Sequence, residues 1–444
     1  MIDDGYVLTV FAWLLTLAVL LGRAWGVGRP VAGLSLAYWL NLSLIHLISG
    51  IIQAFPWYKS PHREESILGF KVTGYAVIGL LVGNAVIAPL IVPASDKREP
   101  SPSADVHPRQ LAVRLIWAGV VCNFLLLGVL GNIPSLGAVV SGGLSLAVAG
   151  FCLLWWGYWR AGEKGKAWRV LCYAPLFPVL TLGLHGFLGA GVVVCLQLAS
   201  FVAVFYRPRR TVILTGLVAV FLGLSLYPVY MRVRSEIRAA VWGGAGVEER
   251  LDRLFLLASE WEWFDSEKSS HLAAIDGRLN QNYLVGKAVR RTSAGVVAFA
   301  GGETLVDSLL ALIPRAVWPD KPQWAGSGGL VSRFTGMHFA RGTAVGIGHV
   351  MELYVNFGAA GVLCGYLVLG TLLGAIDLVA GRHLASGRWD QFVLWYMVGV
   401  PILNVGGNFA ETTAAIAGAI LLTLFVIQAL ASLGPRSRPV AQRG

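Results

Sequence analysis

The sequence predicts an all-α integral membrane protein with about eleven membrane-spanning helices and one large extracytoplasmic loop. Of its 444 residues, 56% are hydrophobic and only 13% are charged, whereas an average soluble domain has roughly 25% charged residues. Apolar runs long enough to cross a bilayer, about 17 residues or more, recur along the chain. The positive charge lies in short segments between these runs, which is typical of membrane orientation rather than of a nucleic-acid-binding face.

The first apolar run, which begins at Tyr6, is expected to be a retained span with its N-terminus outside. Asp3 and Asp4 precede it, so it lacks the basic segment of a signal peptide, and no small-residue cleavage site follows. The predicted spans are 6–22, 31–52, 70–93, 111–131, 134–156, 171–184, 188–205, 212–230, 348–377, 391–406 and 412–432.

The stretch from Leu171 to Phe205 is predicted to form two short helices, because it is too long for one span. Basic residues flank it on both sides, and such residues favour the cytoplasm. The stretch should therefore cross outward and return, turning near His185. The flanking residues are Arg160, Lys164, Lys166 and Arg169 before it, and Arg207, Arg209 and Arg210 after it.

Four regions follow from this layout. Residues 1–230 should form a transmembrane bundle of about eight helices, and residues 348–432 three more. Residues 433–444 form a basic tail predicted to be cytoplasmic, and residues 231–347 form the extracytoplasmic loop. Two amphipathic helices are expected in the loop, one from Leu251 to Phe264 and one that starts with Thr304 as its N-cap and ends before Pro314.

Several kinds of chemistry have no support in the sequence. It contains no P-loop, no dinucleotide-binding glycine pattern in a soluble domain and no HExxH, so no nucleotide, cofactor or metal ion is expected. The cysteines all fall in apolar runs without CxxC spacing, which favours packing over a disulfide framework. These cysteines are Cys122, Cys152, Cys172, Cys195 and Cys364.

The loop is rich in arginine, which points to a phosphate-bearing ligand. Guanidinium groups bind phosphate oxygens in a bidentate manner and stay charged when partly desolvated. A diphosphate headgroup at the outer membrane boundary fits this pattern; the alternative is that most of these cations pair with carboxylates in solvent. Arg315 stands out because it lies between Pro314 and Trp318, near the expected headgroup plane. The other candidate ligands are Arg232, Arg234, Arg290, Arg291, Lys321 and Arg341.

A second polar group begins the next predicted helix. His349 and Glu352 are three residues apart, so they would share a helical face at the outer end of that span. Either could take a proton from a hydroxyl group, although His349 could equally be a capping or interface residue. Asn404, Asn408 and Glu411 are predicted to lie in the same region, while Asn41 and His46 are expected to join helices.

Two motifs carry a resemblance to a known family. Residues 313–322 read Ile-Pro-Arg-x-x-Trp-Pro-Asp-Lys-Pro, and residues 352–361 read Glu-Leu-Tyr-x-Asn-Phe-Gly-x-x-Gly at the start of the following helix. This order after a long outer loop resembles the oligosaccharide repeat-unit polymerases of the O-antigen polymerase (Wzy) type.

The resemblance implies a GT-C-like polytopic glycosyltransferase of the bacterial inner membrane. Such an enzyme joins undecaprenyl-diphosphate-linked oligosaccharide units at the periplasmic face without a metal or cofactor. Arg315, His349 and Glu352 would then be the catalytic residues. The implied partners are the lipid-linked oligosaccharide and membrane lipids. A chain-length regulator is a further partner that the resemblance allows, and no nucleic acid is expected.

Other functions stay open. O-antigen ligases have a His-containing segment that ends in Gly-x-x-Gly, and His349 precedes Gly358 and Gly361. The interval is short and no Asn follows His349, which favours the polymerase. A lipid-linked oligosaccharide flippase should have arginines in a central cavity and repeats between its halves, and the sequence suggests neither. A peptidoglycan glycan polymerase and a non-enzymatic membrane scaffold are further alternatives.

Overall fold

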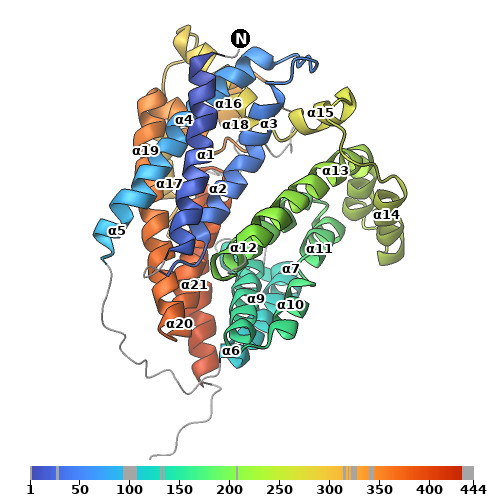
Figure 1. The fold of residues 1–444 in the computed structure, drawn as a ribbon, viewed down its shortest axis with the longest axis vertical. Coiled ribbons are helices and arrows are strands. Elements are labelled where there is room, and N and C mark those ends of the chain that lie inside the picture. The colour runs from blue at the N-terminus through green and yellow to red at the C-terminus, as the bar shows by residue number, and fades with distance from the viewer. Residues whose placement is uncertain are drawn as a thin grey trace, which may run out of the picture.

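The computed structural model describes residues 3–26, 30–93, 108–130, 133, 136–206, 209–313, 317–318, 320–321, 328–339 and 345–432. Within these ranges all regular structure is helical, and no strand occurs. The prediction of an all-α protein is confirmed (Figure 1).

The helices run in chain order as follows. The first half contains α1 (Asp4–Trp25), α2 (Leu34–Ile45), α3 (Leu47–Ile52), α4 (Arg63–Val82), η1 (Gly83–Ile87), α5 (Ala88–Ile91), α6 (Pro108–Val121), η3 (Cys122–Leu126), α7 (Leu127–Leu130), α8 (Leu136–Val140), α9 (Gly143–Arg160), α10 (Lys164–Leu171), α11 (Leu176–His185) and α12 (Leu188–Phe205). The second half contains α13 (Arg209–Trp242), α14 (Val247–Ser259), α15 (Ser269–Asp276), α16 (Gln281–Ser293), α17 (Glu303–Leu310), α18 (Gly328–Thr335), α19 (His349–Ala385), α20 (Trp389–Gly399), η4 (Val400–Leu403) and α21 (Phe409–Ser432).

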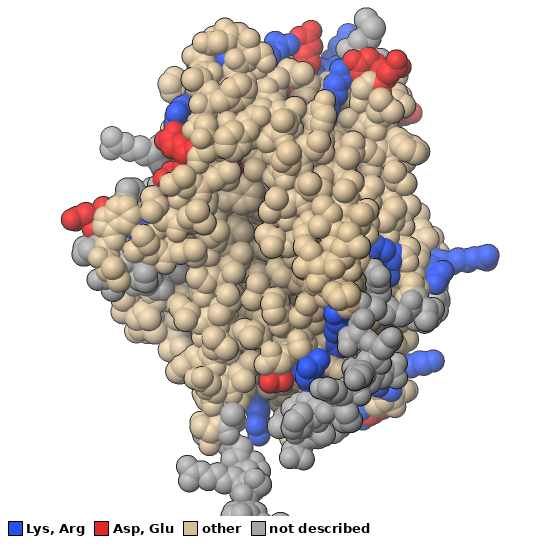
Figure 2. All heavy atoms as spheres, turned by 90° about the vertical axis from the view of Figure 1, so that its left-hand side faces the viewer, with Lys and Arg blue, Asp and Glu red and all other residues tan. Residues whose placement is uncertain are grey.

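Six stretches of the described chain are long and apolar enough to cross a membrane: Asp4–Trp25, Arg63–Ile91, Leu188–Phe205, Arg209–Trp242, His349–Ala385 and Phe409–Leu430. On the face drawn in Figure 2, charged side chains lie mainly toward the two ends, and a wide uncharged band separates them. Both observations indicate a membrane protein. The eleven-span layout stays a prediction, because the other apolar helices are shorter or interrupted.

Close backbone contact holds the bundle together. α4 and η1 pack along α19, and glycines make this approach possible. A Cβ added at Gly79 would lie 2.5 Å from the carbonyl oxygen of Leu363, and one at Gly370 would lie 2.6 Å from that of Leu80. Small residues are common at helix contacts in membranes because they let two backbones approach.

The predicted turn between 171–184 and 188–205 is confirmed. α11 ends at His185, Gly186 follows with φ of 73°, and α12 begins at Leu188. A left-handed residue at this position is a common way to end a helix, and glycine adopts it without a steric cost.

α13 continues to Trp242, past residue 230, where the apolar run predicts the end of the helix. The apolar run ends where Arg232 and Arg234 begin, but helical spacing persists beyond it. Val233 and Ile237 remain buried on one face, against Leu182. Hydropathy marks where a span leaves the apolar layer, whereas the periodicity of buried residues marks where the helix ends.

The long loop is also packed into the bundle rather than separate from it. α16 lies against α4, and its Asn282 forms hydrogen bonds with His46 at the break between α2 and α3. The Nδ1 atom of His46 is 2.7 Å from the Asn282 side-chain oxygen, so the prediction that His46 joins helices is confirmed. Asn41 instead donates to Ala37 of its own helix.

Both predicted amphipathic helices exist, with different ends. α14 stops at Ser259, before Phe264. α17 has Gly302 (φ 100°) as its N-cap, so the expected cap at Thr304 is wrong. Thr304 is instead buried in the first turn, where its hydroxyl accepts a hydrogen bond from Asn356. α17 ends at Leu310, and Pro314 lies outside the described residues.

α19 is not the straight span that was predicted. Phe357 and Gly358 have non-helical backbone angles, and Gly358 has φ of 67°. A Cβ at Gly365 would meet the side chain of Leu353, so the segment before the kink packs beside the segment after it. His349, the first residue of α19, is fully buried.

A buried carboxylate on α19 orders the start of α2. Asp377 accepts hydrogen bonds from the backbone N–H groups of Ala32 at 2.8 Å, Leu34 at 3.1 Å and Ser35 at 3.1 Å. The side chain is 2% exposed. It therefore satisfies donors that the first turn of α2 leaves without intrahelical partners.

Removal of this cap should destabilise the bundle. Asp377→Ala leaves three buried N–H groups without acceptors, at a cost of roughly 2–4 kcal/mol. Thermal unfolding in detergent should show a clearly lower midpoint for Asp377→Ala, and Asp390→Asn, on the first turn of α20, should show little change. An unchanged midpoint for Asp377→Ala would refute the capping role.

Candidate functional site

Glu352 lies buried where α17, α19 and α21 meet. Its side chain is 1% exposed. The backbone N–H of Phe409 donates to its carboxylate at 2.8 Å, and the side chain of Thr304 also forms a hydrogen bond with it. Three segments distant in sequence thus converge on one ionisable group, and such groups rarely occur inside a membrane bundle without a function.

Two helix N-termini come together beside Glu352. The extended segment before α19 runs along the loop before α21, with Gly348 N–H donating to Gly406 and His349 N–H to Val405, both at 3.1 Å. A Cβ at Gly346 would lie 1.9 Å from the Gly406 carbonyl oxygen, so this contact requires glycine. Helix N-termini carry partial positive charge, so the junction favours negative charge.

His349 is fully buried, three residues before Glu352 on α19. Its Nδ1 atom is 3.1 Å from the hydroxyl of Tyr38, which also reaches the hydroxyl of Tyr366 at 3.3 Å. Its Nε2 atom is 3.4 Å from the hydroxyl of Thr412, and its ring stacks on Phe409 with 4.6 Å between centroids. This environment suits a residue that holds α2, α19 and α21 in place.

The predicted polar residues of the last hairpin do lie in this region. Asn408 is buried, and its side chain accepts a hydrogen bond from the backbone N–H of Glu411. A Cβ at Gly407 would touch both Asn404 and Glu411. Asn404 is exposed and Glu411 is half-buried.

Asn356 connects the second motif to the start of α17, a role that the sequence did not reveal. Its amide nitrogen donates to Thr304 and to the carbonyl of Glu352, both at 2.7 Å, and its oxygen accepts from Gly302 N–H at 2.9 Å. It thereby fixes the start of α17 to the kink of α19. The available signal was a single Asn one residue before Phe357-Gly358 in an apolar helix.

Among the residues that the structure describes, the predicted phosphate ligands lie on three separate parts of the chain. Arg232 and Arg234 lie on α13, Arg290 and Arg291 on α16, and Lys321 follows α17. Arg315 and Arg341 lie outside the described residues.

Several of these cations have partners within the protein. Arg290 forms ion pairs with Glu64 and Glu65, the latter at 3.1 Å. The ammonium group of Lys321 donates to the carbonyl oxygens of Ala311 at 2.6 Å and Ile313 at 2.7 Å, so it closes the end of α17. For these two residues the contacts fit the structural alternative better than phosphate binding.

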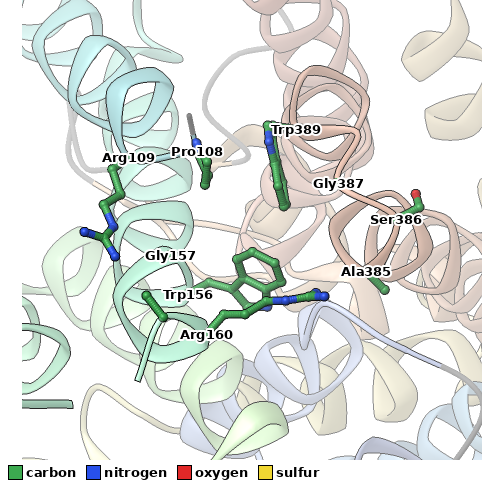
Figure 3. Close-up of a pocket in the computed structure, with 10 residues that line it drawn as sticks. Pro108, Arg109, Trp156, Gly157, Arg160, Ala385, Ser386, Gly387 and Trp389 are labelled. Atoms are coloured by element: carbon green, nitrogen blue, oxygen red, sulfur yellow. The ribbon is translucent and has the colours of Figure 1, made fainter. Parts of the chain in front are cut away.

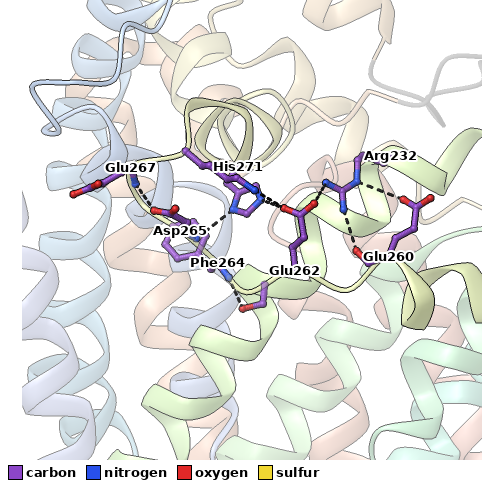
Figure 4. Close-up of polar contacts among 9 residues, drawn as sticks. Arg232, Glu260, Glu262, Phe264, Asp265, Glu267 and His271 are labelled. Carbon is purple, nitrogen blue, oxygen red and sulfur yellow. Dashed lines mark hydrogen bonds and ion pairs between the residues drawn. The ribbon is translucent and has the colours of Figure 1, made fainter.

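Arg232 belongs to an exposed polar network around Glu262 (Figure 4). Glu262 accepts from Arg232 at 3.0 Å, from Lys268 at 2.8 Å, and lies 3.1 Å from the Nε2 atom of His271. The hydrogen bond from Lys268, followed by that from His271 and the charge of Arg232, lowers the pKa of the Glu262 carboxyl to about 2. The network anchors the segment after α14 to α13.

The anchor should loosen in acid. Because the folded-state pKa of Glu262 lies below its ordinary value of 4.5, its stabilising effect is present above pH 4.5 and is lost as the pH falls toward 2. A nitroxide attached at Glu267→Cys, with the native cysteines replaced, should give an immobile spectrum at pH 6 and a mobile one at pH 2.5. Glu262→Gln should be mobile at both values. An immobile wild-type spectrum at pH 2.5 would contradict the assignment.

Neither a cluster of candidate metal ligands nor a disulfide is present among the described residues. No three His, Cys, Asp or Glu side chains there gather closely enough to hold a metal ion. The five cysteines are all free thiols.

Comparison with known proteins places the chain in one family. No curated protein and no solved structure matches it. One family model, described as a domain of unknown function (DUF8712), matches residues 95–387. The match covers more than half of the chain and includes α13 to α19 with Glu352. The chain therefore belongs to the DUF8712 family.

Proposed function

We propose that this chain is a metal-independent glycosyltransferase that joins undecaprenyl-diphosphate-linked oligosaccharide repeat units into a surface polysaccharide. The observation that carries the proposal is Glu352, a buried carboxylate from the second motif, held at the junction of two helix N-termini. Asn356 of the same motif joins it to α17, which leads into the first motif.

The proposed reaction needs a base and a site for a leaving diphosphate. An acceptor hydroxyl of one repeat unit attacks the anomeric carbon of the lipid-linked chain, and a new C–O bond forms. The bond from that carbon to the diphosphate breaks, and undecaprenyl diphosphate leaves with the electron pair. Glu352 takes the hydroxyl proton, and a guanidinium group, with Arg315 as the first candidate, stabilises the leaving charge.

The remaining assignments follow from this reaction. His349 positions Glu352's helix through Tyr38 and Thr412. Arg234, Arg291 and Arg341 remain candidate ligands for the lipid diphosphate, which would be bound at the periplasmic face of the inner membrane. A chain-length regulator is a further candidate partner.

A second candidate function is transport of the lipid-linked oligosaccharide. The observation that favours it is the pair of interruptions in packed helices, at Phe357–Gly358 in α19 and at η4 before α21. Transporters often bind substrate at such broken helices, with helix N-termini facing anionic groups.

Deletion of the chain separates these functions. A polymerase predicts lipid A core that carries single repeat units only. A flippase predicts unpolymerised units that accumulate on the cytoplasmic leaflet. A ligase predicts full-length polymer that stays on undecaprenyl diphosphate. Long polymer on the lipid A core of the deletion strain would overturn all three.

A further inference from the structure

A cavity of about 380 Å³ lies at the opposite end of α19 from Glu352. The end of α9, the start of α6 and the turn between α19 and α20 surround it. Figure 3 shows Arg160 extending along Trp156 toward this turn, with Trp389 on the facing side. The volume is in the range of sites that bind small ligands. We refer to it as the Arg160 cavity.

Its position corresponds to a membrane–water boundary. α9 ends at Arg160, and the turn after α19 spans Ser386 to Arg388 before α20 begins at Trp389. α19 is one of the stretches apolar enough to cross a membrane, and this turn follows its last residue. The indole rings of Trp156 and Trp389 pack edge to face, with 5.0 Å between centroids. Tryptophan is enriched at the headgroup level of membranes, where its ring is partly apolar and partly polar.

The cavity is also positively charged. The guanidinium of Arg160 lies 5.1 Å from the centre of the Trp156 ring, and among the described residues no carboxylate forms an ion pair with it. Arg109 borders the same cavity and pairs with Glu163. The guanidinium lies over the Trp156 ring and Arg160 is exposed, so its N–H groups can reach an acceptor in the cavity.

We propose that the Arg160 cavity binds the headgroup of an anionic phospholipid. Arg160 contacts the phosphate, and Trp156 and Trp389 contact the glycerol and upper acyl region. The site is distinct from the Glu352 junction, and its occupant is a membrane component rather than the proposed substrate. On the orientation predicted from charge, it faces the cytoplasmic leaflet.

Native mass spectrometry of the purified full chain tests this proposal. The protein is titrated with phosphatidylglycerol, with phosphatidylcholine and with inorganic phosphate. Phosphatidylglycerol should bind at least roughly tenfold more tightly than phosphatidylcholine, and Arg160→Ala should lose roughly tenfold in affinity for phosphatidylglycerol. Arg160→Lys keeps the charge but loses the planar guanidinium that binds two phosphate oxygens at once, so it should lose part of that affinity.

Arg169→Ala is the matched control, because Arg169 is an exposed arginine of the neighbouring α10 that does not line the cavity. It should bind phosphatidylglycerol as the wild type does. Equal binding of the two lipids, equal losses in the Arg160 and Arg169 variants, or displacement of phosphatidylglycerol by equimolar inorganic phosphate would overturn the proposal. If Arg160→Ala does not fold, the comparison of Arg160→Lys with Arg169→Lys decides it.

Discussion

Replacement of Glu352 by glutamine is expected to lower the rate of polymer formation by roughly 10²–10⁴-fold, the usual contribution of a general base. Glutamine has nearly the same shape and can still accept the hydrogen bond from Phe409 N–H. It cannot accept a proton from a sugar hydroxyl. The fold should therefore persist while the chemistry is lost, and the polymer ladder from cells with Glu352→Gln should collapse to single repeat units.

Glu303→Gln is the matched control. Glu303 is a carboxylate on the first turn of α17, close in sequence to Thr304, but it is exposed and pairs with Arg333. Exposed ion pairs contribute little, so Glu303→Gln should give a normal ladder. With both variants at equal membrane levels, a full-length ladder from Glu352→Gln would remove Glu352 from the chemistry.

The second large effect concerns folding: Gly286→Val should prevent α16 from docking on α4. A Cβ at Gly286 would lie 1.9 Å from the carbonyl oxygen of Glu65, and one at Gly69 would lie 1.9 Å from that of Asn282. The two backbones touch at this crossing, so a side chain cannot be accommodated unless the helices move apart. Overpacking alone costs roughly 1–3 kcal/mol, and separation would also break the bonds between Asn282 and His46.

Gly329→Ala provides the comparison for this effect. Gly329 lies on α18 in the same part of the chain, and an added Cβ there meets nothing within 4 Å. It should be neutral or slightly stabilising, since alanine is the better helix former. We expect Gly286→Val to lower the thermal midpoint and the membrane level strongly. Wild-type values for Gly286→Val would mean that the α4–α16 crossing is not as close as described.

The fold class follows from composition alone, but the helix limits do not. An apolar run locates a span because lipid exposure requires apolar side chains. It does not locate the end of α13, since the helix continues past Arg232 with one buried face. The sequence does not predict the kink at Phe357–Gly358 either, because glycine is tolerated in straight membrane helices and a positive φ depends on packing.

The candidate site was predictable where its residues belong to motifs. Glu352 stood out as a carboxylate at the start of an apolar helix. Its partner Thr304 was predicted to be a helix cap, and Phe409 could not be predicted at all, because it contributes a backbone N–H group across the bundle. The contacts of Arg290 and Lys321 depend on tertiary structure in the same way. A sequence shows which side chains can bind phosphate and not which are already paired.

Reconstituted polymerisation tests the central claim most directly. The purified chain is placed in liposomes with undecaprenyl-diphosphate-linked repeat units and EDTA, and the products are separated by length. The proposal predicts a ladder of oligomers and released undecaprenyl diphosphate from the wild type, and unchanged monomer from Glu352→Gln. Monomer that remains unextended with the wild-type protein, and that moves from one leaflet of the liposome to the other, would contradict the polymerase and support the flippase.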